Sequence, residues 1–141
     1  MRVLIDTCVI IDALQTREPF AKDAESIFKS AAVQRFSGYL TAKSIADLYY
    51  LMHHITHNSQ AARDVLSKLL SLFGLLDTTG TDCLKAISSP VTDYEDAVMI
   101  ETASRESMDI IVTRNLCDYS KSKVRIISPS AFLNQLQADK N

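Results

Sequence analysis

Short runs of apolar residues alternate along this chain with longer segments in which apolar residues recur at helical spacing. Because the short runs are apolar on both faces, each is expected to be a strand buried between two layers of helices. Strands separated by helices usually pair in parallel. The alternation therefore predicts an α/β fold, with a mostly parallel central sheet of about five short strands flanked by helices. The predicted strands are residues 2–5, 39–41, 74–79, 109–113 and, at an edge, 124–127.

The segments between these strands are predicted helices, and several carry residues typical of helix ends. Pro19 is expected to be the first residue of the second helix, and Gly74 is expected to stop the helix over residues 60–73. The spacing Thr92-x-x-Glu95 predicts a capping box at the start of a late helix. The predicted helices cover residues 7–15, 19–31, 42–55, 60–73, 81–89, 92–107 and 128–136.

Length and charge limit the possible partners. With 141 residues, the chain is expected to form one domain over its whole length. Its net charge is -2, whereas proteins that bind nucleic acid by bulk phosphate neutralisation are basic, so any phosphate contact has to be local or carried by a metal. Three scattered cysteines without a C-x-x-C pair are typical of reduced thiols. Asp6 and Asp12 interrupt the apolar N-terminus, and no apolar run approaches membrane-spanning length; we therefore expect a soluble, cytoplasmic protein.

Polar residues follow two of the predicted strands. Asp6 comes directly after the first strand, and Thr113, Arg114 and Asn115 follow the fourth. The carboxyl ends of parallel strands lie at one edge of the sheet, where ligands bind in such folds. The fold prediction thus brings together two polar sequences that are far apart in the chain. Taken alone, Asp6 is explained equally well as the N-cap of the next helix, a contribution of about 1 kcal/mol.

Two further acids are candidates for the same edge. Asp47 lies one position off the apolar stripe of its helix, where a solvated acid is a slightly better explanation. Asp96 shares a helix face with Ile100 and Ala103 and is expected to point towards the protein. Converging carboxylates would repel one another unless a cation lay between them. A hard divalent cation, Mg²⁺ or Mn²⁺, takes carboxylate and water ligands and would resolve the conflict.

The segments VLIDTCVIIDAL, TAKSIADLYYL, DYEDAVMIETASRESMDIIVTRN and VRIISPSAFL, in this order, resemble a PIN domain. Within that family the chain is most similar to the small, single-domain toxin nucleases of the VapC type, and the resemblance covers about residues 2–136. It implies a single PIN-like nuclease domain over residues 1–141. The implied function is a Mg²⁺- or Mn²⁺-dependent endoribonuclease that hydrolyses RNA phosphodiester bonds, as the toxin of a toxin–antitoxin pair.

The resemblance also implies the site residues. The acidic residues of the family carry over to Asp6, Asp47 and Asp96, which are the expected catalytic residues and metal ligands. Many relatives have Glu at the position of Asp47. Relatives often read T-R-D where this chain reads Thr113-Arg114-Asn115. Asn115 is the expected fourth catalytic residue; its side chain offers a neutral oxygen in place of a carboxylate, which leaves open whether a second metal binds. Residues expected to support the site or contact RNA are Thr7, Ser44, Thr113, Arg114 and Asp118.

The implied partners are an RNA substrate, a separately encoded antitoxin and a second copy of the chain in a homodimer. The run from Tyr49 to Met52 places more apolar surface around one helix than a single stripe buries, either for an interface or for extra core packing. An alternative function is a catalytically silent PIN-like module that binds RNA or a protein, which Asn115 favours. A less favoured alternative is zinc binding by His53 and His57, which lie one helical turn apart.

Overall fold

The computed structural model describes residues 1–140, apart from the side chain of Asp118. The strands are β1 (Arg2–Ile5), β2 (Ser37–Thr41), β3 (Gly74–Leu76), β4 (Ile110–Val112) and β5 (Arg125–Ile127). They form one sheet in the order β3-β2-β1-β4-β5, and every neighbouring pair is parallel. The predicted α/β fold is confirmed, with β5 at an edge. Helices and the 3₁₀ helix η1 are α1 (Thr7–Leu14), α2 (Ala21–Ala32), α3 (Ala42–Thr56), α4 (Ser59–Leu72), α5 (Gly80–Ile87), α6 (Tyr94–Arg105), η1 (Leu116–Tyr119) and α7 (Pro129–Ala138).

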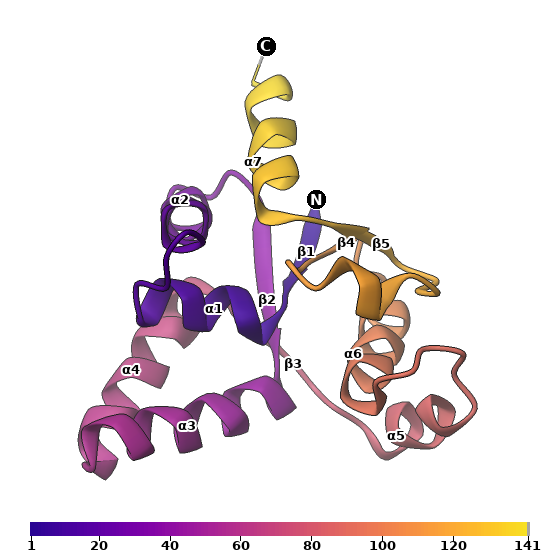
Figure 1. Ribbon diagram of the computed structural model, residues 1–141, viewed down its shortest axis with the longest axis horizontal. Helices are drawn as coiled ribbons and strands as arrows, with labels where there is room; N and C mark the ends of the chain where they lie inside the picture. Colours follow the sequence, from indigo (N-terminus) through magenta and orange to yellow (C-terminus); the bar gives the residue numbers. More distant parts are fainter. Residues whose placement is uncertain (141) are drawn as a thin grey trace.

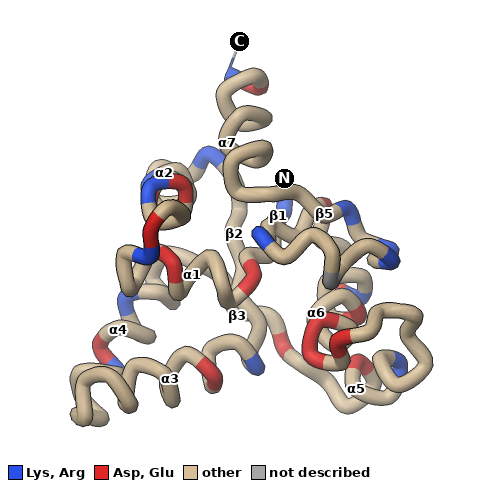
Figure 2. Tube along the Cα trace, in the orientation of Figure 1, with Lys and Arg blue, Asp and Glu red and all other residues tan. Residues whose placement is uncertain are grey.

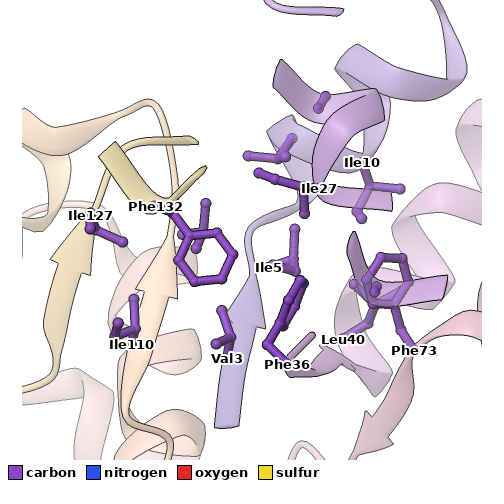
Figure 3. Packing of buried hydrophobic residues seen from close by; sticks show 14 of the residues in the cluster. Val3, Ile5, Ile10, Ile27, Phe36, Leu40, Phe73, Ile110, Ile127 and Phe132 are labelled. Atoms are coloured by element: carbon purple, nitrogen blue, oxygen red, sulfur yellow. The ribbon is translucent and has the colours of Figure 1, made fainter. Parts of the chain in front are cut away.

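Alternate residues of the central strands point to opposite faces of the sheet, and each face has its own apolar core. Val3, Ile5 and Ile110 belong to the core that packs against α1, α2, α4 and α7 (Figure 3). Leu4 and Ile111 belong to the second core, which packs against α5, α6 and η1. Figure 1 shows α5 and α6 lying together, away from α2 and α7. The result is a sheet between two layers of helices, which explains why the strand sequences are apolar on both faces.

The strand order sets the position of the polar segments. β1 pairs with β4 so that Ile5 lies opposite Val112, and the backbone N–H of Asp6 donates to the carbonyl of Val112 at 2.9 Å. Thr113 follows Val112 directly, so Asp6 and Thr113 are neighbours at the carboxyl edge of the sheet. The predicted meeting of these two sequences is confirmed. Among the described residues, no helix is long and apolar enough to cross a membrane.

Two predicted helix ends are wrong. α2 begins at Ala21 with Phe20 as its N-cap, so Pro19 belongs to the preceding turn and not to the helix. α4 ends at Leu72, and Gly74 is the first residue of β3, not a helix stop. A Cβ atom at position 74 would lie 2.7 Å from the ring of Tyr39. Glycine is therefore needed here because the neighbouring strand brings an aromatic ring against the backbone.

The predicted capping box at Thr92 and Glu95 is also wrong, by one residue. The N-cap of α6 is Asp93, whose carboxylate accepts a hydrogen bond from the N–H of Asp96 at 3.0 Å. Thr and Asp both cap helices well, and two candidates side by side leave the start ambiguous. A true capping box occurs instead at the start of α5, between Thr79 and Asp82, which also shortens the strand predicted over residues 74–79.

Candidate active site at the carboxyl edge of the sheet

Asp6 occupies the N-cap position of α1, yet within the described part of the chain its side chain makes no capping hydrogen bond. Its Oδ2 atom instead accepts a hydrogen bond from Thr113 Oγ1 at 2.7 Å and one from Cys8 Sγ at 3.4 Å. Burial and the charge of Asp6 raise the pKa of Cys8 to about 11, so the thiol remains a donor at neutral pH. Only 6% of Asp6 is exposed. A buried carboxylate held in this way is not explained by helix capping.

Asp96 lies in the first turn of α6, and its Oδ1 atom accepts a hydrogen bond from the hydroxyl of Tyr119 at 2.9 Å. Burial, with the nearby charges of Asp6 and Asp96, raises the pKa of Tyr119, so the phenol stays protonated. The prediction that Asp96 points towards the protein is confirmed. Sequence reasoning missed Tyr119, because its contact joins η1 to α6 and no local pattern records it.

The two carboxylates line one cleft of about 130 Å³. Figure 2 shows acidic residues at the end of β1, in α3 and at the start of α6, the elements that bound this end of the sheet. The described residues that line the cleft are Asp6, Thr7, Lys43, Ser44, Asp47, Glu95, Asp96 and Met99. Four carboxylates thus share the cleft with one ammonium group, so it attracts cations and repels phosphate unless a cation binds.

Lys43 is that ammonium group, and it connects two sides of the cleft. Its Nζ atom forms an ion pair with Asp47, one helical turn further along α3, and lies 3.4 Å from a carboxylate oxygen of Glu95 on α6. Although burial opposes it, the hydrogen bond and charge of Asp47 raise the pKa of Lys43. The spacing of Lys43 and Asp47 is visible in the sequence, whereas the contribution of Glu95 to the cleft is not.

Two hydroxyl groups join α1 to α3 in the wall of the cleft. Thr7 Oγ1 donates to Ser44 Oγ at 2.9 Å, and the backbone N–H of Ser44 donates to Thr41 Oγ1, the N-cap of α3, at 3.1 Å. The structure therefore places both Thr7 and Ser44 beside the acidic residues. This network holds the first turn of α3, and with it Asp47, against the end of β1.

Two other residues selected from the sequence, Arg114 and Asn115, are not among the described residues that line the cleft. The guanidinium of Arg114 donates to both oxygens of buried Asp12, at 2.7 and 3.2 Å, and lies over the ring of Phe20. Asn115 is exposed and, among the described residues, is not part of the cleft lining. Asp118 belongs to η1, but its side chain lies outside the described residues.

The carboxylates of the cleft are the kind of ligand that a hard divalent cation takes. Among the side chains that the structure describes, no group of three or more His, Cys, Asp or Glu residues is arranged to hold a metal ion. The zinc candidates His53 and His57 belong to no such group among the described residues, and the ring of His53 stacks on the ring of Tyr49. Mg²⁺, however, is commonly held by one or two carboxylates, with waters and substrate phosphates completing its shell. The oxygen ligands of Asp6 and Asp96, in a cleft with room for waters, fit Mg²⁺ or Mn²⁺ in that mode.

A family model described as PIN domain matches residues 2–116 of the chain. This match covers β1 to the start of η1, and with them every described residue that lines the cleft. Among curated proteins, none has a significant sequence match to the chain.

Solved structures with the same fold include toxin–antitoxin complexes. FitAcB from Neisseria gonorrhoeae is 20% identical, with a TM-score of 0.67 over 91% of this chain and 98% of that chain. VapBC-1 from nontypeable Haemophilus influenzae is 14% identical, with a TM-score of 0.68 over 92% and 99% of the two chains. VapC20 from Mycobacterium tuberculosis, described as a sarcin-ricin loop cleaving toxin, is 10% identical, with a TM-score of 0.63 over 87% and 98%. At these identities the likeness shows a shared fold.

Proposed function

Because the chain belongs to the PIN domain family, we propose that it is a metal-dependent endoribonuclease and the toxin of a toxin–antitoxin pair. The observation that carries this proposal is the state of Asp6. The Asp6 carboxylate follows a buried strand, makes no capping hydrogen bond within the described residues, and lines the same cleft as Asp96. A cleft lined by four carboxylates and one ammonium group would otherwise be unfavourable, since the like charges repel one another when no cation is bound.

Three of the acidic residues have a proposed role at the metal. Asp6 and Asp96 supply direct ligands for Mg²⁺ or Mn²⁺, and Asp47 completes the shell directly or through a water. When bound, the cation would lower the pKa of a water and position it in line with the phosphorus of the scissile bond. The hydroxyls of Thr7 and Ser44 hold the two sides of the cleft together, and Thr113 holds Asp6.

Arg114 and Asn115 take more limited roles in this proposal. Arg114 donates two hydrogen bonds to Asp12, so its main proposed role is to hold the loop after β4 against α1. Asn115 donates its backbone N–H to Thr113 Oγ1 at 3.1 Å, which supports the hydroxyl that in turn holds Asp6. Both residues act at the site mainly by fixing the segment that contains Thr113.

The proposed partners are an RNA substrate, a separately encoded antitoxin and a second copy of the chain. Structures with the same fold include VapBC and FitAB complexes, which supports a cognate protein partner. Exposed apolar residues on α3, with Tyr50 73% exposed and Ile55 47% exposed, support a homodimer. We place this activity in the cytoplasm, in keeping with the three free cysteines.

The direct test is incubation of the purified protein with a mixed RNA pool in Mn²⁺, in Mg²⁺ or in EDTA. We predict cleavage with either metal and none in EDTA, because the cleft carboxylates repel phosphate without a cation. The matched control is Asp64→Asn, which removes an exposed carboxylate on α4 that is not among the described residues lining the cleft, and should cleave like the parent. Cleavage that continues at full rate in EDTA would contradict metal dependence.

A second candidate function is a catalytically silent PIN-like module that binds RNA or a protein. Two observations favour it: Asn115 carries no charge, and no three metal-binding side chains converge among the described residues. Calorimetry with Mn²⁺ separates the two functions. The nuclease binds Mn²⁺ and loses the binding on Asp6→Ala, whereas the silent module gives no metal-dependent heat with either protein.

A further inference from the structure

Tyr119 lies in a segment with many polar residues, yet its ring is 1% exposed. It packs into the second apolar core together with Leu4, Ile100 and Ile111. The members of this core come from β1, α6 and β4 among others, so the ring is held within a core that several elements build. The position of its hydroxyl is therefore set by core packing and not by the solvent.

From this fixed position the hydroxyl donates to Asp96 Oδ1 at 2.9 Å and lies 3.5 Å from the sulfur of Met99. Asp96 and Met99 both line the acidic cleft. A carboxylate in the first turn of a helix can rotate about its side-chain bonds unless a partner fixes it. A hydrogen bond from a fixed donor to one oxygen restricts this rotation, and with it the direction of the other oxygen.

Thr113 restricts the orientation of the other cleft carboxylate, that of Asp6, in the same way. It is fully buried, and its hydroxyl donates to Asp6 Oδ2 at 2.7 Å. Asp6 and Asp96 come from different elements, the end of β1 and the start of α6, yet their hydroxyl donors lie six positions apart in one segment. The segment that runs from Thr113 to Tyr119 thus touches both carboxylates through side chains anchored in the protein interior.

We infer that Tyr119 is a positioning residue of the cleft, whose hydroxyl orients Asp96 towards a divalent cation as Thr113 orients Asp6. This inference rests on the proposed metal site and adds to it a residue that touches neither metal nor RNA. Donors that orient a metal-binding carboxylate typically change metal affinity by about 10–100-fold when they are removed.

The test is a calorimetric titration of the purified, metal-free protein with Mn²⁺, comparing the parent with Tyr119→Phe. Phe keeps the buried ring and removes only the hydroxyl. We expect the dissociation constant for Mn²⁺ to rise about tenfold or more. The metal-free melting temperature, measured by circular dichroism, should stay close to that of the parent. Should the variant melt early, the titration is carried out well below its own melting midpoint, where it is folded.

The matched control is Tyr94→Phe. Tyr94 begins the same helix, and its hydroxyl donates to the carbonyl of Cys83 at 2.8 Å, outside the cleft lining given by the described residues. The Tyr94→Phe variant loses a hydroxyl hydrogen bond two residues from Asp96 in the sequence but keeps the hydrogen bond from Tyr119 to Asp96, so its Mn²⁺ affinity should match that of the parent. An affinity for Mn²⁺ in Tyr119→Phe equal to that of the parent, with or without a lower melting temperature, overturns the inference alone. A parent that binds no Mn²⁺ overturns both the inference and the proposed metal site.

Discussion

Asp12 carries its carboxylate into the protein interior, with 1% of the side chain exposed. Arg114 compensates this charge with two hydrogen bonds, and the hydrogen bond to Asp12 raises the pKa of Arg114 against the opposing effect of burial. A charge buried to this extent is tolerated only when it is paired. Arg114 follows Thr113 directly, so this pair also fixes the backbone that presents the Thr113 hydroxyl to Asp6. Arg114 therefore contributes both to the stability of the fold and to the position of Thr113 beside Asp6.

We predict that Arg114→Gln lowers the free energy of unfolding by about 3 kcal/mol, because Asp12 is left buried without its charged partner. Urea denaturation of the parent and the variant measures the difference. The control is Arg63→Gln, which changes an exposed arginine and should stay within about 0.5 kcal/mol of the parent. A similar small change in Arg114→Gln would show that the ion pair contributes little and would leave Arg114 available for RNA.

At the scale of elements, α5 and α6 are joined by a second buried acid. Asp82 Oδ2 accepts a hydrogen bond from Thr102 at 2.8 Å, and Arg105 donates to Asp82 Oδ1 at 3.0 Å. The same carboxylate closes the capping box with Thr79 at the start of α5. Burial alone would raise the pKa of Asp82, but these hydrogen bonds hold it at about 2, below its ordinary value. The pair of helices that carries Asp96 is therefore stabilised by ionisation of Asp82.

The pH dependence of stability follows from that lowered pKa. The contribution, about 2 kcal/mol, is present above the unfolded-state pKa of about 3.9 and is lost as the pH falls towards 2. In Asp82→Asn, we expect lower stability at pH 7 and a shallower decline between pH 4 and pH 2. Unfolding free energies measured across this range give the comparison. Parallel curves for parent and variant would rule out Asp82 as the source of this acid sensitivity.

Sequence reasoning succeeded where the direction of the parallel strands decides the outcome. Alternation of apolar runs predicts the parallel sheet, and the parallel sheet predicts that Asp6 and Thr113 meet, because strand direction alone fixes that edge. It failed at the start of α6, since Thr92 and Asp93 are both good caps and only the folded backbone shows which one reaches the N–H of Asp96. Side-chain contacts that depend on how helices pack also carry no local signal.

Some residues of the site could likewise be predicted from the sequence, and others could not. Asp6 and Asp96 could be selected because each interrupts an apolar pattern, whereas the cleft contributions of Glu95 and Tyr119 depend on how α6 packs against α3 and η1. Arg114 was predicted to be at the site from its place after β4, but its pairing with Asp12 depends on the packing of α1. Burial of a charged partner cannot be read from spacing alone.

At the scale of the whole molecule, the described surface includes apolar residues on α3 that the fold leaves uncovered. Met52 is buried in the core, as one prediction for this run allowed, but Tyr50 is 73% exposed on the same helix. Ile55, one turn further, is 47% exposed. Figure 1 shows α3 and α4 extending to one side of the sheet. These exposed apolar side chains are available for an interface.

We predict that the protein is a homodimer, and that the double variant Tyr50→Glu, Ile55→Glu is a monomer, because two charges in each copy would be buried on association. Light scattering at micromolar concentration gives the mass directly. The control is Leu84→Glu, which places a charge on an equally exposed apolar residue of α5 and should leave the mass unchanged. A monomeric parent would contradict the homodimer.

The central claim is that Asp6 holds a divalent cation, and Mn²⁺ titration of Asp6→Asn beside the parent tests it most directly. Asn accepts hydrogen bonds from Thr113 and Cys8 as Asp does, so the fold should persist, and metal-free stability should hold or rise because one of several repelling carboxylates is neutralised. We predict that the parent binds Mn²⁺, whereas Asp6→Asn melts normally and neither binds Mn²⁺ nor cleaves RNA. An Asp6→Asn protein that melts normally, binds Mn²⁺ and cleaves RNA like the parent would contradict the metal site.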